Sequence, residues 1–206
     1  MNEEEKKPHN QASAWFNDLY REHKDNHEKI PWAKLEVNPL LKSYLDETKE
    51  HKGKALVIGC GLGDDARALE LAGYEVLAID VSEKALELAG ERFSDSKIVF
   101  EKQDVFDMPE KYHEHFDFVF EAFTIQSLPV EFREKMIEAV ANTVAINGKL
   151  LLVAHKKKLT LSGPPWPLKR DEVDLFKEHL GEISFELHPT TKLFALEQFR
   201  VLYKRL

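Results

Sequence analysis

Three glycines and one aspartate have the types and the spacing of a nucleotide-binding site. Gly59, Gly61 and Gly63 follow an apolar run at alternate positions, and a second apolar run, 75–79, ends at Asp80. Glycines at such a turn let the backbone approach a ligand closely, and an aspartate after the next strand can accept hydrogen bonds from two ribose hydroxyls. The spacing therefore predicts a strand, a glycine-rich turn, a helix and a second strand that together bind a nucleoside.

The residues after the glycines argue against a phosphate ligand. In the dinucleotide loop G-x-G-x-x-G the third glycine would stand at position 64, where this chain has aspartate. Asp64 and Asp65 put negative charge at the start of the helix, where a phosphate would otherwise bind. A cationic or zwitterionic ligand fits better, and Asp64 or Asp65 could accept a hydrogen bond from its ammonium group. Helix capping is an equally good role for one of the pair.

Further candidate binding residues follow the expected strand ends, because the ligand of an open α/β sheet lies beyond the carboxyl ends of the strands. We expect Val81 to pack on the nucleobase and Asp104 to accept from its amino group, with Val105 or Phe106 against the ring. A turn or N-cap role for Asp104 is the alternative. Cys60 lies between two glycines of the turn, and we interpret it as a small residue beside the ligand rather than a nucleophile.

Glu121 and His155 are the candidate catalytic residues. Glu121 follows the fourth expected strand and could act as a base or as an electrostatic partner of a cationic ligand. An ordering hydrogen bond to the backbone is an equally good alternative. His155 follows the fifth strand and could act as a base near neutral pH, whereas a surface position at the start of a lysine-rich loop is the simpler alternative. Gln126, between them, could orient a substrate.

The elements that must position these residues alternate between strands and helices. Apolar runs predict strands near 54–58, 75–79, 97–101, 116–120 and 148–153. Helical periodicity predicts helices near 64–72, 82–92 and 130–144, the last ended by Asn147-Gly148. Two further strands, 183–187 and 194–203, read as a hairpin at the sheet edge. The predicted fold class is α/β, a Rossmann-like doubly wound sheet that is mostly parallel with an antiparallel C-terminal edge.

The chain of 206 residues is predicted to be a single domain, 1–206. Before the sheet, the residues Ala12, Trp15, Phe16, Leu19 and Tyr20 form an apolar helical stripe. We expect this leader, 1–28, to act as a lid or pocket wall, with core packing as the alternative. The segment 163–167, Gly-Pro-Pro-Trp-Pro, is too rich in proline for regular structure.

Composition excludes several classes of protein. The formal net charge of −8 argues against a nucleic-acid binder, which needs a basic face. No apolar stretch approaches the ~20 residues of a membrane helix, and the charged N-terminus predicts no signal peptide. The single cysteine fits a cytoplasmic protein. His23 and His27 have a metal-like spacing but no third ligand nearby, so we predict no metal site.

With these motifs, the chain resembles the class I S-adenosylmethionine (SAM) methyltransferases, and within them the thiopurine S-methyltransferase and tellurite-resistance group. The segments that carry the resemblance are Ile30-Pro-Trp32, Asn38-Pro39, the loop 59–65, Ile79-Asp80-Val-Ser82, the segment 124–129 and the segment 162–167. It implies SAM as cofactor, S-adenosylhomocysteine as product, and Trp32 near the SAM pocket. It also implies in-line methyl transfer to a small-molecule acceptor, with a thiol or another soft nucleophile among the candidates.

Three alternatives share this fold. A non-catalytic SAM-binding sensor or partner protein would have nearly the same sequence, since fold does not fix function. An amino-methylating nucleic-acid enzyme would carry Asn/Asp-Pro-Pro-aromatic after the fourth strand, where this chain reads Glu121-Ala-Phe-Thr. An aminopropyltransferase would need an acid-rich polyamine pocket, which one aspartate pair does not establish.

Overall fold

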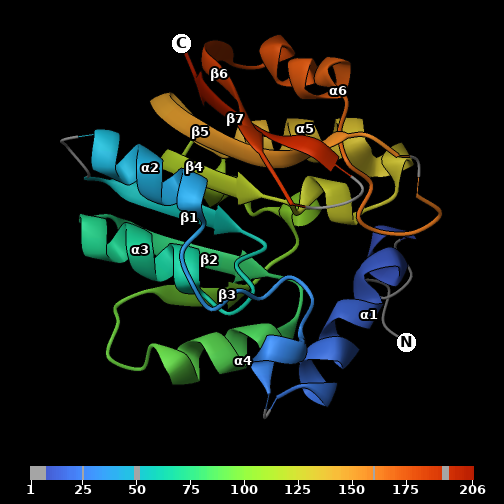
Figure 1. Ribbon diagram of the computed structural model, residues 1–206. Coiled ribbons are helices and arrows are strands. Elements are labelled where there is room, and N and C mark those ends of the chain that lie inside the picture. Colours follow the sequence, from blue (N-terminus) through green and yellow to red (C-terminus); the bar gives the residue numbers. More distant parts are fainter. Residues whose placement is uncertain (1–7, 25, 49–51, 160, 192–194) are drawn as a thin grey trace. The chain divides into compact units, whose positions relative to one another are not determined.

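The computed structural model describes residues 8–24, 26–48, 52–159, 161–191 and 195–206. Contacts between Cα atoms divide the chain into two compact units, Met1–Asp104 and Val105–Leu206, and each is described by itself. Both units contain strands flanked by helices (Figure 1). The single domain 1–206 stays a prediction.

Three parallel strands form the sheet of the first unit, in the order β3-β2-β1. Their bounds are Lys54–Ile58 for β1, Glu75–Asp80 for β2 and Val99–Lys102 for β3. Buried β1 and β2 are apolar along almost their whole length, as central parallel strands are. The register pairs Ile58 with Ile79. The glycine turn after β1 and the aspartate that ends β2 therefore emerge at the same carboxyl edge, as predicted.

The helices of the first unit begin at recognisable sequence signals. Their bounds are Pro8–Glu22 for α1, Pro39–Glu47 for α2, Asp64–Ala72 for α3 and Glu83–Arg92 for α4, with the 3-10 turn η2 at His27–Lys29. The Asn38 side chain accepts a hydrogen bond from the Leu40 N–H at 2.9 Å and so caps α2. Ser82 caps α4 in the same way, through the Ala85 N–H at 3.1 Å. The starts predicted near 64 and 82 are confirmed by α3 and α4.

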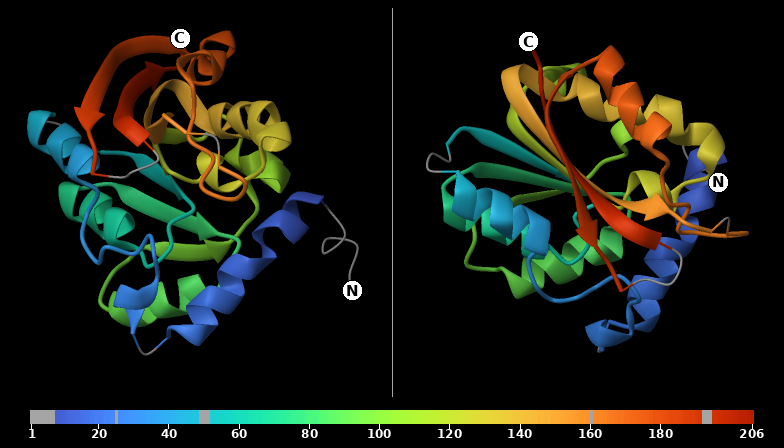
Figure 2. Two further views of the ribbon diagram at one scale, coloured as in Figure 1. Left: turned by 45° about the vertical axis from the view of Figure 1, so that its right-hand side comes forward. Right: turned by 45° about the horizontal axis from the view of Figure 1, so that its top comes forward.

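The leader helix α1 packs against α4 (Figure 2). From its C-terminal half, Tyr20 enters a buried cluster that also contains Ile30, Leu62, Ala85 and Leu88. The apolar stripe predicted for the leader therefore has a partner, and part of that stripe belongs to the core of the first unit.

The second unit combines parallel and antiparallel strands, in the order β4-β5-β7-β6. Their bounds are Phe116–Ala122 for β4, Val144–Lys157 for β5, Gly181–Pro189 for β6 and Ala195–Lys204 for β7. β4 and β5 are parallel, and β7 runs antiparallel to both β5 and β6 (Figure 1). This arrangement confirms the predicted fold class, including the antiparallel C-terminal hairpin. Residue 194, the predicted start of the last strand, lies outside the described residues.

Short helical elements connect these strands. They are η3 Val105–Asp107, η4 Glu110–Tyr112, η5 Ile125–Ser127, η6 Val130–Phe132, α5 Arg133–Asn142, α6 Arg170–Asp174 and η7 Leu175–Glu178. The segment 163–167 contains no helix or strand, as predicted. Within the described residues, no helix has the length and apolar character that crossing a membrane requires.

The prediction that Asn147-Gly148 ends the preceding helix is wrong. The helix α5 ends at Asn142, and β5 begins at Val144, opposite Phe116. Asn147 has a positive φ of 65° and lies at a bulge, where the register of β5 against β4 shifts. A Cβ at Gly148 would lie 2.7 Å from the Phe116 carbonyl oxygen, so glycine is needed within the strand. The Asn-Gly pair marks a bulge rather than a helix end.

Candidate active site

Asp80 joins the two loops that follow β1 and β2. Its Oδ2 accepts a hydrogen bond from the Gly61 N–H at 2.9 Å, and its Oδ1 accepts one from the Ser82 N–H at 2.9 Å. The Cys60 N–H donates to the Ile79 carbonyl at 2.9 Å and holds the same turn. A carboxylate oxygen has two lone pairs, so both Asp80 oxygens can still accept from a ligand hydroxyl. The arrangement suits a ribose diol.

The surroundings of Asp80 are tightly packed. Burial raises the pKa of its carboxyl, and the backbone hydrogen bonds from Ser82 and Gly61 oppose that rise. Gly61 has a φ of +52°, and a Cβ there would lie 2.9 Å from the Tyr20 hydroxyl. The positive φ and the nearby Tyr20 hydroxyl both favour glycine at this position. Val81, beside Asp80, is 36% exposed and thus available to a nucleobase.

The two aspartates after the glycines have different partners. Asp64 forms a bidentate ion pair with Arg92, with distances of 2.7 and 2.8 Å. Arg92 also donates to the Leu62 carbonyl, so this pair fastens α4 to the glycine turn. Asp65 accepts the Asn38 N–H through Oδ1 at 2.7 Å, and burial raises its pKa to about 6. Asp64 is therefore engaged within the protein, and Asp65 is the better candidate for a ligand ammonium.

Aromatic side chains from the leader gather beside the glycine turn. The Trp32 Nε1–H donates to the Tyr20 hydroxyl at 2.8 Å, and Tyr20 in turn reaches Gly61. The Trp15 and Phe16 rings lie 5.5 and 5.3 Å from the Trp32 ring between centroids. Trp32 is 39% exposed. It therefore presents aromatic surface next to the turn, and its place near a SAM pocket stays a prediction.

The leader is fastened by a contact that the sequence did not reveal. The Asn17 Oδ1 accepts hydrogen bonds from the Ser82 hydroxyl at 3.0 Å and from the Lys84 N–H at 3.1 Å. Asn17 and Arg92 both hold elements of the candidate binding site, yet no local motif marks either one. Their partners are 28 to 67 residues away in the chain, so only the tertiary structure identifies them.

The chain after β3 is also tied to Asp80. The Gln103 N–H donates to the Asp80 carbonyl at 3.2 Å, and the Gln103 side-chain amide donates to the Asp104 carbonyl at 3.0 Å. Asp104 is half-buried at the end of the first unit. Val105 is buried in η3 of the second unit, and Phe106 in the same turn is half-buried. Their roles at a nucleobase stay predictions.

Glu121 is fully buried at the end of β4 in the second unit. Its Oε1 accepts the Thr124 N–H at 2.7 Å and the Ile125 N–H at 3.0 Å. Its Oε2 has no hydrogen-bond partner among the described residues. Burial raises the pKa of Glu121 to about 7, with the hydrogen bonds from Ile125 and Thr124 acting in the opposite direction. The ordering role and a proton-transfer role are therefore compatible, since each uses a different oxygen.

His155 lies inside β5, with only 5% of its surface exposed, so the alternative of a surface histidine is wrong. Its ring stacks on the Phe123 ring at 4.7 Å between centroids, and Nδ1 lies 3.4 Å from the Gln198 amide. The backbone N–H of His155 donates to the side-chain Oε1 of Gln126 at 2.8 Å. The backbone carbonyl of Gln126 accepts the backbone N–H of Trp166 at 2.7 Å. Gln126 thus orders β5 and the proline-rich segment rather than facing solvent.

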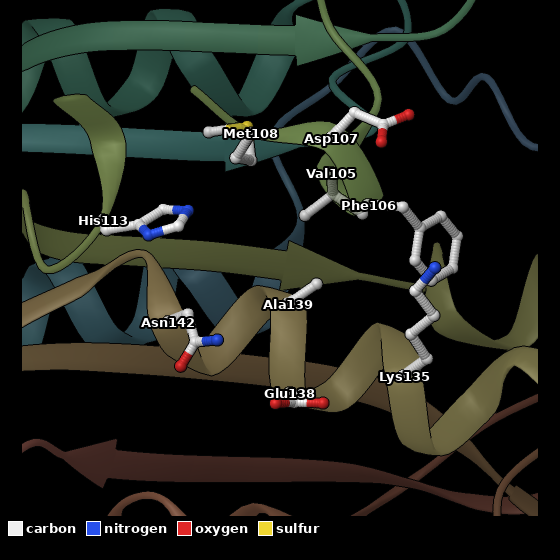
Figure 3. A pocket seen from close by; sticks show the side chains of 9 residues that line it. All are labelled: Val105, Phe106, Asp107, Met108, His113, Lys135, Glu138, Ala139 and Asn142. Atoms are coloured by element: carbon white, nitrogen blue, oxygen red, sulfur yellow. The ribbon is translucent and has the colours of Figure 1, made fainter. Parts of the chain in front are cut away.

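The second unit also contains a pocket of about 490 Å³ between α5 and the segment around η3 (Figure 3). Its lining residues are Val105, Phe106, Asp107, Met108, His113, Lys135, Glu138, Ala139 and Asn142. The Lys135 ammonium lies 5.3 Å from the centroid of the Phe106 ring. Of the candidate binding residues, Val105 and Phe106 line this pocket, whereas Glu121 and His155 do not. Across the described residues, no cluster of His, Cys, Asp or Glu could hold a metal ion.

Comparison with known proteins decides the family. The family model described as thiopurine S-methyltransferase matches residues 20–184. The chain belongs to this family. It is 29% identical over 163 residues to thiocyanate methyltransferase 1 of Arabidopsis thaliana, covering 77% of this chain and 70% of that protein. It is 24% identical over 193 residues to thiopurine S-methyltransferase of Legionella pneumophila strain Corby, covering 85% of each.

Solved structures confirm the fold of this family member. Magnesium protoporphyrin IX methyltransferase from Synechocystis, crystallised with bound SAM, superposes with a TM-score of 0.74 at 16% identity, covering 95% of this chain and 97% of that one. The protein is a SAM-dependent methyltransferase that acts on a small molecule. The comparisons give no support to the non-catalytic alternative.

The residues of the first unit fit SAM. The free lone pairs of Asp80, the glycine cradle and the exposed Val81 match a ribose, an amino-acid chain and a base. Asp65 at the start of α3 matches a ligand that carries an ammonium and no phosphate.

Proposed function

We propose that this methyltransferase is an S-methyltransferase, which transfers the SAM methyl group to the sulfur of a small thiol or a related soft nucleophile. The names of its relatives support sulfur as the acceptor atom. The observation that carries the cofactor assignment is the pair of hydrogen bonds from the Gly61 and Ser82 N–H groups to the Asp80 carboxylate. These bonds leave carboxylate lone pairs for a ribose. We further propose that the protein works in the cytoplasm, as its single cysteine favours.

Each candidate residue around Asp80 has a role in the proposed SAM site. Asp80 holds the ribose, Val81 and Val105 contact the base, and Asp104 accepts from its amino group. Asp65 accepts from the ammonium. The remaining residues of the proposed site lie along the methionine portion or beside it: Trp32, Gly59, Cys60, Gly61 and Gly63. When bound, SAM supplies a methyl group activated by a positively charged sulfur.

The protein itself has to orient the acceptor and exclude water. Glu121 and His155 are the proposed catalytic residues, and Glu121 is also the proposed electrostatic partner of the cofactor. A thiol with a pKa near 8.5 has some thiolate at neutral pH, and a base increases that fraction. Both side chains are buried in the second unit, which limits competing water.

Calorimetry with SAM, S-adenosylhomocysteine and NAD tests the proposed cofactor site. We expect micromolar SAM binding, no NAD binding, and a loss of affinity of about 10²- to 10⁴-fold in Asp80→Ala. That range corresponds to two hydrogen bonds to a charged group, worth about 1.5–3 kcal/mol each. The exposed Asp46 on α2 offers the control Asp46→Ala. NAD binding in place of SAM would overturn the assignment.

We propose that the leader helix α1 forms a wall of the SAM site rather than an independent appendage. The contacts of Asn17 with α4 and of Tyr20 with Gly61 support this role. Deletion of residues 1–28 is expected to weaken SAM binding while the strands β1 to β3 stay folded. Unchanged SAM affinity and turnover in the deletion variant would contradict the proposal that α1 forms a wall of the SAM site.

A further inference from the structure

A buried carboxyl and a half-buried hydroxyl stand together where β4 ends. Glu121 has no exposed surface, and its Oε2 has no hydrogen-bond partner among the residues that the structure describes. The Thr124 hydroxyl also hydrogen-bonds to this carboxyl and lowers its pKa. Thr124 is only half-buried. The Thr124 hydroxyl also lies 3.5 Å from the Ala122 carbonyl oxygen, to which it can donate. Thr124 is thus a partly exposed residue beside a carboxyl that has no exposed surface of its own.

The backbone fixes this pair in place. The Thr124 and Ile125 N–H groups both donate to Glu121 Oε1, so the loop that begins η5 closes on the carboxyl. Phe123, which lies between Glu121 and Thr124 in the chain, has a φ of +65°, a left-handed conformation that is strained for a phenylalanine. Strain of this kind persists where surrounding contacts hold it, often at functional sites. Here the left-handed turn at Phe123 brings Thr124 back to the Glu121 side chain, three residues earlier in the chain.

We propose that Thr124 and Glu121 form a proton relay for the methyl acceptor, and that the enzyme therefore prefers acceptors with an S–H bond over anions without one. The proposal rests on the S-methyltransferase function proposed above and names the acceptor class. It separates a neutral thiol from an anion such as thiocyanate, the acceptor named in one relative.

The relay balances the transfer. The acceptor S–H bond breaks, its proton moves to the Thr124 Oγ, and the hydroxyl proton of Thr124 moves to the Glu121 carboxylate. The electron pair left on the acceptor sulfur forms the bond to the methyl carbon. The bond from that carbon to the sulfonium breaks, and its electron pair stays on the sulfur of S-adenosylhomocysteine. The protonated Glu121 then returns its proton to the Thr124 hydroxyl, which releases its own proton to water.

The cations on neighbouring elements of the second unit are engaged with other groups. Arg133 of α5 pairs with Glu172 and donates to the Trp166 carbonyl at 2.7 Å. Lys156 of β5 pairs with Glu197 at 2.7 Å. The nearby His155 ring is buried against Phe123. Burial is the largest cause of the raised Glu121 pKa, and no charged neighbour contributes to it. An ionised Glu121 would therefore repel an anionic acceptor.

The test compares Thr124→Val, Thr124→Ser and Glu121→Gln with the wild-type enzyme, using 2-mercaptoethanol and thiocyanate as acceptors. With the thiol, we expect kcat/KM to fall about 10²- to 10⁴-fold in Glu121→Gln and at least about tenfold in Thr124→Val. Thr124→Ser should retain activity because it keeps the hydroxyl. With thiocyanate, Thr124→Val should stay within about threefold of wild type. Below about pH 7, the thiol reaction of the wild type should decline.

A second readout does not depend on turnover. A carbon-13 NMR titration of the Glu121 carboxyl should show a higher midpoint in Thr124→Val, because that variant lacks the hydroxyl that stabilises the carboxylate. Equal losses with both acceptors, or an unchanged midpoint, would overturn the relay and leave S-methylation standing. A wild-type enzyme that methylates thiocyanate but not the thiol would overturn it too. Activity with neither acceptor would instead count against the proposed function itself.

Discussion

The buried carboxyl of Glu121 should make the stability of this protein depend on pH. In the folded protein its pKa is raised to about 7 from a normal value of 4.5. Between these two values the folded protein holds a proton that the unfolded chain has released. Unfolding therefore releases a proton, and the free energy of unfolding falls as the pH rises through this range. Below about pH 4.5 the carboxyl is protonated in both states and the effect disappears.

The size of the effect follows from the shift. One pKa unit corresponds to 1.36 kcal/mol, so a shift from 4.5 to about 7 lowers the stability at pH 8 by about 3 kcal/mol relative to pH 4. Glu121→Gln cannot titrate and lacks this loss. The difference in unfolding free energy, variant minus wild type, should therefore rise by about 3 kcal/mol between pH 4 and pH 8. Asp65, whose pKa is also raised, affects both proteins alike.

Urea unfolding followed by tryptophan fluorescence, at one-unit steps from pH 4 to pH 8, measures this difference. Glu134→Gln, on the exposed face of α5, is the matched control and should give a curve parallel to wild type. Parallel curves for Glu121→Gln and wild type would refute the reasoning, because they would mean that the carboxyl ionises equally easily in both states.

Four further substitutions probe the first unit. Gly61→Ala should destabilise the fold by about 1–3 kcal/mol in thermal unfolding, because it strains a φ of +52° and places a Cβ 2.9 Å from the Tyr20 hydroxyl. Adding Tyr20→Phe should recover part of that loss of stability. If the stability changes of the two substitutions simply added, the close contact between residue 61 and the Tyr20 hydroxyl would be contradicted. Asp64→Asn should lower stability by about 1–3 kcal/mol through the weakened Arg92 pair, with SAM affinity measured by calorimetry unchanged. A large loss of affinity would show that Asp64 faces the ligand. Asn17→Ala removes the acceptor for two groups at the start of α4, so limited proteolysis should cleave α1 faster, and an unchanged rate would exclude this anchor.

The sequence alone determined much of the first unit of the fold. Strand β1 and helix α3 have the predicted bounds, because an apolar run, a glycine turn and an N-terminal acid pair are local signals. The meeting of the glycine turn and Asp80 was also predictable, since parallel strands end at the same edge. The Asn147-Gly148 pair misled the prediction, because the same local signal serves helix ends and bulges.

Only the tertiary structure decided which polar side chains are engaged. Asp64 and Asp65 are adjacent and chemically identical, yet Arg92, 28 residues from Asp64, forms its ion pair with Asp64. Glu121 has a raised pKa because the surrounding chain buries it, and burial is a property of packing rather than of any motif. Local patterns determine strands, turns and caps, since these depend on neighbouring residues. The charge state and the partner of each side chain depend on groups that only the folded chain brings together.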